Sequence, residues 1–174
     1  MQAHEKQCKF RKVECPFWPC RDLVTFGEVV EHVQGAHEGL ISYEGNEDEL
    51  IFSWAIYQQR EKVHYIPGIA LVHRHKFFLN CIKINHSTMF WVSISGPEEE
   101  AQKFEARITG WHNGKNYEMG IRITGSVYSI EMSKDEVLQD QTGILEVSKN
   151  MTDKMGKMQD GEFEINTEFK IIRK

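Results

Sequence analysis

Short runs in which apolar and polar residues alternate fill the chain from about residue 40 to its end. Alternation with a period of two is typical of β-strands that bury one face. The Asn113-Gly114 pair between two such runs indicates a tight hairpin. The predicted strands are Leu50–Tyr57, Tyr65–Val72, Phe77–Ile84, Met89–Ser95, Lys103–Trp111, Tyr117–Thr124, Val127–Met132, Ile144–Ser148 and Glu162–Ile172. So many short strands predict a mainly β protein, folded as an antiparallel β-sandwich of about eight strands.

Three short segments within this region depart from the simple strand pattern. Pro67 cannot donate a ladder hydrogen bond, so its strand is predicted to lie at a sheet edge or to carry a bulge. Ser133 and Glu136 have the spacing of a capping box and predict a helical turn at Lys134–Leu138. The acidic residues Glu98–Glu100 indicate the start of a helix or a turn.

Residues 25–37 have the period of a short helix instead. Apolar residues share one face of this predicted helix: Phe26, Val29, Val30 and Val33. Thr25 and Glu28 have the capping-box spacing, and we predict that they open the helix. Gly35 is predicted to release it, so that the chain turns back after the helix.

Two cysteines precede this helix and two histidines lie near its end, with the spacing C-x4-C-x11-H-x4-H. Two thiolates and two imidazoles are a common tetrahedral ligand set for zinc. The predicted ligands of a Zn2+ ion are therefore Cys15, Cys20, His32 and His37. Four protein ligands leave no open coordination position, so this zinc is predicted to be structural. A disulfide would leave the two histidines without a role.

This pattern divides the chain into a zinc finger region at 1–38 and a β-sandwich at 39–174. His4 and Cys8 have the spacing of one more ligand pair. One interpretation is that they are the remnant half of another metal site, whose first two ligands are missing. The other interpretation is an unpaired surface histidine and cysteine, because two ligands alone do not hold zinc.

The composition indicates a globular protein and gives no sign of a membrane span or a secretion signal. The 174 residues carry a net charge of −5 and are 40% hydrophobic, which suits a packed core. The chain has no apolar run long enough to span a membrane, and its first residues lack the apolar segment of a secretion signal. Reduced thiols that bind zinc fit the cytoplasm or the nucleus, where disulfides are rare. Residues 1–37 carry five basic and five acidic side chains, which makes a nucleic-acid-binding finger the weakest alternative.

The residues give little support for an enzyme. Cys81 is the one cysteine outside the finger region, and in the middle of a strand it is expected to be small and buried rather than nucleophilic. His73 and His75 are expected on a solvated strand face, with no carboxylates to complete a metal site. No catalytic residue is assigned.

The finger sequence HEKQCKFRKVECPFWPC, a helix ending in H-x4-H and a β domain directly after it together resemble the seven in absentia (SIAH/SINA) family. The resemblance covers nearly the whole chain. The four predicted zinc ligands fall on the second zinc site of that family, and His4 and Cys8 fall on the last two ligands of its first. Softer matches are Gly45 with Glu47-Asp48 and Phe52, Phe77–Lys83, Gly96–Ile108 and Glu164–Ile171. The spacing between Cys15 and Cys20 is shorter than the usual family pattern.

The resemblance implies a TRAF-like sandwich that forms a homodimer and recruits protein substrates for ubiquitin-dependent degradation. In that family, a RING finger upstream binds the ubiquitin-conjugating enzyme. Four cysteines are too few for a RING in this chain. The expectation is therefore the substrate-recognition module of a SIAH-type E3 ubiquitin ligase. A RING-less TRAF-like adaptor without ligase activity is the alternative.

The resemblance also implies where partners bind. An extended peptide adds as one more strand to an exposed sheet edge, whose unpaired N–H and C=O groups it completes. In this chain the corresponding residues are Ile41, Tyr43, Tyr65, Ile66 and Ile69.

Overall fold

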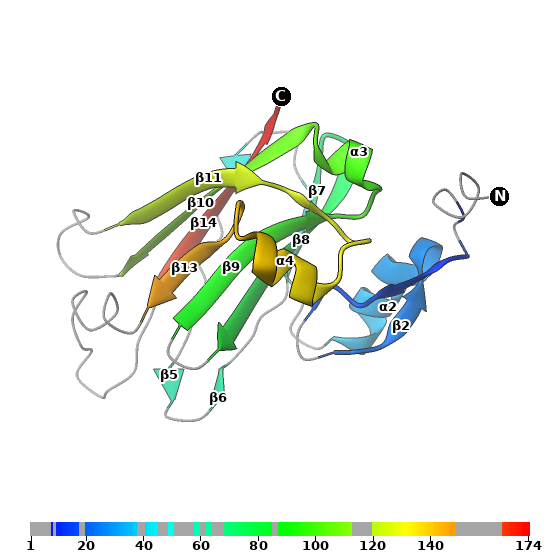
Figure 1. Cartoon of the computed structure of the whole chain (residues 1–174), viewed down its shortest axis with the longest axis horizontal. Helices are drawn as coiled ribbons and strands as arrows, with labels where there is room; N and C mark the ends of the chain where they lie inside the picture. Colours follow the sequence, from blue (N-terminus) through cyan, green and yellow to red (C-terminus); the bar gives the residue numbers. More distant parts are fainter. Residues whose placement is uncertain are drawn as a thin grey trace.

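The chain folds as a β-sandwich with a small finger packed against one side (Figure 1). The computed structural model describes residues 8, 10–17, 20–37, 41–44, 49–50, 58–59, 62–63, 68–84, 87–112, 120–148 and 165–174. Most of these residues that lie beyond the finger belong to strands of two sheets. The predicted mainly β sandwich is therefore confirmed.

One sheet has the strand order β11-β10-β14-β4 and is antiparallel throughout. Its strands are β4 (Glu49–Leu50), β10 (Phe104–His112), β11 (Ile121–Ser126) and β14 (Ile165–Arg173). The long pairing of β10 with β14, from Phe104 opposite Arg173 to His112 opposite Ile165, forms its centre.

The other sheet has the strand order β12-β9-β8-β7-β3, and β13 also pairs with β9. Its strands are β3 (Ile41–Glu44), β7 (Gly68–Val72), β8 (His75–Ile84), β9 (Ser87–Ile94), β12 (Tyr128–Ser129) and β13 (Leu145–Ser148). Two pairs are parallel, β3 with β7 and β12 with β9, where the sequence predicts an antiparallel arrangement. Strands β5 (Gln58–Gln59) and β6 (Lys62–Val63) form a separate short hairpin.

The main core lies between the two sheets and follows the predicted alternation. Side chains at every second position of β8 and β9 face those of β10 and β14. The fully buried members of this cluster include Phe77, Leu79, Phe90, Val92, Ile94, Ile108, Phe169 and Ile171. Each large apolar side chain buried in this way contributes about 1.5–3 kcal/mol of hydrophobic free energy.

The central parts of β8 and β9, residues 77–82 and 90–94, are buried on both faces. The intervening side chains, among them Phe78, Ile82 and Trp91, are at most 2% exposed although they point away from the main core. The helix α4 (Lys134–Asp140) covers part of this outer face, and the finger covers the rest. The sequence Phe77-Phe78-Leu79-Asn80-Cys81-Ile82 lacks strict alternation for this reason.

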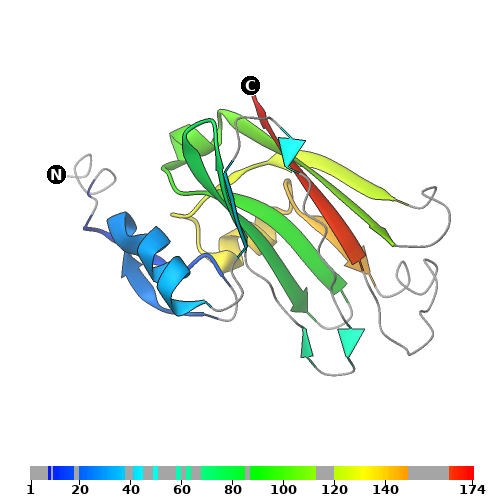
Figure 2. The ribbon, with the colours of Figure 1, turned by 180° about the vertical axis from the view of Figure 1, so that it is seen from behind.

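The finger contains the hairpin of β1 (Lys12–Glu14) with β2 (Leu23–Thr25), a 3-10 turn at Phe26–Glu28 and the helix α2 (Val29–Ala36). It lies beside β8 and α4 in both views of the molecule (Figures 1 and 2). Thr25 makes no capping hydrogen bond, and the predicted capping box of Thr25 with Glu28 is wrong. The 3-10 turn occupies the positions that the box needs, and the Thr25 hydroxyl accepts a hydrogen bond from Lys12 Nζ instead.

Other predicted segments differ in extent. The capping box of Ser133 and Glu136 is confirmed, and the helix that it opens runs to Asp140. The strand predicted at Val127–Met132 is shorter in the structure and spans only Tyr128–Ser129. After it the chain turns toward the finger, where Ile130 packs. The acidic segment forms the short helix α3 (Glu98–Ala101). The predicted strand residues 51–57, 65–67, 117–119 and 162–164, together with Asn113-Gly114 of the hairpin, lie outside the described residues. Among the described helices, none has the length and hydropathy to cross a bilayer.

Candidate metal centre

The four predicted ligands converge at one point of the finger. One ligand atom from each of Cys15, Cys20, His32 and His37 lies within 4.8 Å of all the others. Cys15 Sγ is 3.3 Å from His37 Nε2, and Cys20 Sγ is 3.6 Å from His32 Nε2. A tetrahedral zinc ion, with bonds of about 2.3 Å to sulfur and about 2.0–2.1 Å to nitrogen, separates these atoms by about 3.6 Å. The ligand set and its spacing therefore fit a tetrahedral ion of this size.

Local structure places each ligand. Cys15 directly follows β1, where its backbone N–H donates to Asp22 O at 2.9 Å and so closes the turn that carries Cys20. His32 lies on α2, and His37 follows the last helical residue with an extended backbone. The end of the helix brings the two imidazole rings together, 5.4 Å apart and nearly perpendicular.

The electrostatics of the site favour metal over free thiolate. Burial, together with the nearby Cys20, raises the pKa of the Cys15 thiol to about 12. Burial also lowers the pKa of His37, as does the neighbouring His32. A neutral imidazole at His37 is ready to bind a metal, and a cation can compensate the Cys15 thiolate that burial alone disfavours. With four protein ligands, such a site holds the finger together rather than activating water.

The metal centre is joined to the sandwich by a second apolar cluster. From the finger it contains Val13, Cys15, Phe17, Val29 and Val33, and from the sandwich Ile69, Phe78 and Ile130. The Phe17 ring packs edge-on against Phe78 at 5.8 Å and against His37 at 5.5 Å. A residue between the two cysteines thus touches both a ligand and the sheet.

Polar contacts reinforce this joint. Arg11 forms an ion pair with Glu131, and its guanidinium lies 3.8 Å from the centre of the Phe26 ring. The Lys134 ammonium donates to Glu14 Oε1 at 3.4 Å, to Phe17 O at 3.2 Å and to Cys20 O at 2.5 Å. Sequence reasoning assigned no role to Lys134, because its partners lie at least 114 residues away along the chain.

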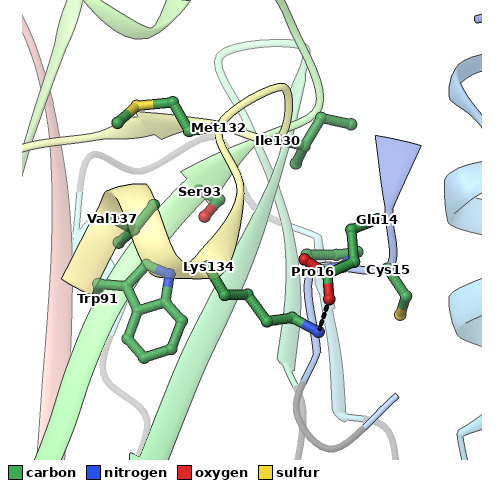
Figure 3. Close-up of a pocket in the computed structure, with 9 residues that line it drawn as sticks. All are labelled: Glu14, Cys15, Pro16, Trp91, Ser93, Ile130, Met132, Lys134 and Val137. Atoms are coloured by element: carbon green, nitrogen blue, oxygen red, sulfur yellow. Dashed lines mark hydrogen bonds and ion pairs between the residues drawn. The ribbon is translucent and has the colours of Figure 1, made fainter. Parts of the chain in front are cut away.

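A small cavity of about 10 Å³ separates the finger from the sandwich beside Lys134 (Figure 3). It is lined by Glu14, Cys15, Pro16, Trp91, Ser93, Ile130, Met132, Lys134 and Val137. This volume is close to the minimum that can hold one water molecule, so the finger and the sandwich are closely packed around Lys134.

The remnant half-site is outside this centre. His4 lies outside the described residues, and Cys8 is a partly exposed free cysteine that is not among the four clustered ligands.

The predicted peptide-binding residues separate into three groups. Ile41 and Tyr43 belong to β3, which is the last strand of its sheet within the described part of the chain. Tyr65 and Ile66 lie outside the described residues. For Ile69 the prediction is wrong, because its side chain is only 5% exposed and packs in the cluster between finger and sandwich. Its strand β7 is also paired on both sides, with β8 and β3.

The cysteine and the two histidines considered as catalytic candidates lie in the sandwich core or beside it. Cys81 is buried in the main core, and burial raises its pKa well above the ordinary range. The His75 ring approaches Glu100 at 3.3 Å and packs against Phe104. His73 and Arg74 form the turn between β7 and β8, both with positive φ.

Comparisons with known proteins do not identify a family for this chain. Neither the scan against protein-family models nor the search of curated proteins gives a match.

Proposed function

We propose that this chain is the substrate-recognition and dimerisation module of a SIAH-type E3 ubiquitin ligase, with a zinc ion of purely structural role. The observation that supports this proposal most is the full Cys2His2 ligand set packed directly onto a β-sandwich. This combination is what the sequence resemblance implies. The four free cysteines fit the reducing cytoplasm or nucleus, where ubiquitin ligases act.

The binding surface in this proposal is the outer edge of β3, the last strand of its sheet among the described residues. That strand pairs with β7 from Ile41 opposite Gly68 to Glu44 opposite Leu71, and it ends the order of its sheet as described. Its outer backbone groups can accept an extended peptide as one more strand. Ser42 is exposed, whereas Tyr43 packs against the main core, so the peptide would contact backbone more than side chains.

The metal has no chemical step in this function. Zinc, when bound, would hold Cys15, Cys20, His32 and His37 together and so keep Phe17 against Phe78. The finger would then stay fixed on the outer face of the β8–β9 sheet. A rigid finger sets the position of any domain that precedes it relative to the peptide edge.

Chemical-shift mapping tests the binding site. A peptide from a captured partner, added to isotope-labelled protein, should shift the amide resonances of β3 and leave those of the edge strand β11 unchanged. Shifts confined to β11 or to the finger would contradict the β3 edge.

The alternative is a TRAF-like adaptor without ligase activity, and partner abundance separates it from the proposal. If the natural protein is a ligase, its deletion should raise the level of a captured partner and remove that partner's ubiquitin chains. An adaptor would bind the same partner without changing either. A nucleic-acid-binding finger is disfavoured by the five basic and five acidic side chains of residues 1–37, and a salt-sensitive gel shift would be its signature.

A further inference from the structure

Lys134 is a buried lysine from the sandwich whose ammonium group ends inside the finger. Its side chain is 8% exposed. The three ammonium donors have three acceptors: Glu14 Oε1, Phe17 O and Cys20 O. Two of these acceptors are backbone carbonyls of the Cys15–Cys20 turn, which carries both cysteine ligands.

The position of Lys134 is fixed from the sandwich side. It is the first residue of α4, directly after the Ser133 cap. One turn later, Val137 packs with Trp91 in the cluster on the outer face of the sheet. Ile130 and Glu131 also contact the finger just before the helix. The helix cannot shift without disrupting these contacts, so Lys134 presents its charge at a defined point.

The contact matters to both sides. A buried ammonium is costly unless it is well hydrogen-bonded, and the finger supplies Lys134 with the three acceptors named above. The Phe17 and Cys20 carbonyls in turn accept hydrogen bonds from a residue of the sandwich. Figure 3 shows Lys134 reaching from α4 across the cavity to Glu14, on the side of the finger that carries Cys15.

We propose that Lys134 is a positioning residue for the metal centre: it holds the Cys15–Cys20 turn in ligand geometry and thereby couples metal binding to the β-sandwich. Residues just outside the ligand shell commonly change metal affinity by about 10–100-fold, because they orient the ligands. This inference concerns the metal centre and does not require that the chain recruit ubiquitination substrates.

The first test replaces Lys134 by methionine, which keeps the length of the side chain and removes its charge and donors. Cobalt binding, followed by visible absorption of the thiolate-bound ion and by competition with a chelator, measures the dissociation constant. We expect Lys134→Met to weaken cobalt binding by about 10–100-fold. The matched control is Lys103→Met, because Lys103 is an exposed lysine of the sandwich whose ammonium pairs with Glu100. A folded Lys134→Met variant with the affinity of the control would overturn the proposal.

A measurement on the unmodified chain decides the case if Lys134→Met does not fold. Amide hydrogen exchange of α4 is compared in the zinc-loaded and the chelator-treated protein. We expect removal of the metal to accelerate exchange in α4 by about tenfold or more while the β10–β14 pair is unchanged. Exchange that accelerates in α2 but not in α4 would overturn the coupling. Metal binding without partner capture would contradict only the proposed function.

Discussion

Cys15 and Cys20 are held differently although both are predicted ligands. Cys15 is fully buried and follows a strand, whereas Cys20 is partly exposed and begins the irregular return to β2. Cys15 thus belongs to the apolar cluster that joins finger and sandwich as well as to the metal centre. Cys20 is the ligand whose replacement disturbs packing less, so it reports on metal binding more directly.

Replacing Cys20 by serine should abolish metal binding. Elemental analysis of the purified chain should find about one zinc ion per molecule, and close to none in the Cys20→Ser variant, because a hydroxyl is a poor ligand for zinc. The loss is large, since structural zinc binding contributes about 10–16 kcal/mol. Cys8→Ser is the control, because Cys8 lies outside the four-ligand cluster. Zinc retained by Cys20→Ser would show that the cluster is not the metal site.

Acidification should release the metal and destabilise the finger. Burial lowers the pKa of His37 relative to its unfolded value, so the unfolded chain binds a proton more readily than the folded one. Neutral His37 therefore contributes to the stability of the finger and to metal binding above about pH 6.5. Both contributions are lost as the pH falls below that value. Zinc release to a chromogenic chelator between about pH 7.5 and about pH 5.5 measures this, above the titration range of ordinary carboxylates. Tighter zinc binding at the lower pH would contradict the assignment of His37.

The two helices show that one local sequence signal has different outcomes. Both begin with a capping-box spacing, Thr25 with Glu28 and Ser133 with Glu136. Only at α4 does the side chain bind the backbone, and hydrogen bonds from Ser133 lower the pKa of Glu136. At Thr25 the preceding strand pairs with β1, and the chain continues as a 3-10 turn. Strand pairing thus overrides the cap at one helix and leaves it intact at the other.

This difference predicts unequal costs for two matched substitutions. Ser133→Ala should lower the free energy of unfolding by about 1 kcal/mol, because it removes a formed cap. Thr25→Ala should cost less than about 0.5 kcal/mol, because it removes only an exposed contact with Lys12. Urea denaturation of both variants provides the comparison. Equal losses would mean that Thr25 caps its helix in solution.

At the scale of the whole molecule, the finger and the sandwich share one interface. Phe78 and Ile69 of the sheet pack with Phe17 and the helix residue Val33 of the finger. The sequence boundary at residue 38 separates two patterns of residues, but the apolar cluster extends across it. Loss of the finger would expose the outer face of a sheet that is buried on both sides.

The ring contact between Phe17 and Phe78 provides a measure of this coupling. Each single change to leucine should cost about 1–2 kcal/mol of unfolding free energy. The double variant should cost less than their sum by about 0.5–1.5 kcal/mol, because an edge-on aromatic pair is lost only once. Phe17 paired with Phe169, which lies in the other cluster, should be additive within about 0.5 kcal/mol. Full additivity of Phe17 with Phe78 would indicate that the finger does not pack there in solution.

The sequence by itself determined what depends on near neighbours. The period of two located most strands, the Cys and His spacing identified the ligand set, and Ser133 with Glu136 predicted a helix start. Such patterns record which residues are buried or paired locally, because strand and helix geometry repeat over a few residues.

Only the tertiary structure decided which surfaces cover one another. The burial of Ile69 under the finger, the parallel pairing of β3 with β7 and the contacts of Lys134 all join segments that are far apart in the sequence. A local pattern does not specify its distant partner, since any complementary apolar face or acceptor of suitable geometry satisfies it. The fold selects that partner, and for this chain the selection packs the metal centre against the sandwich.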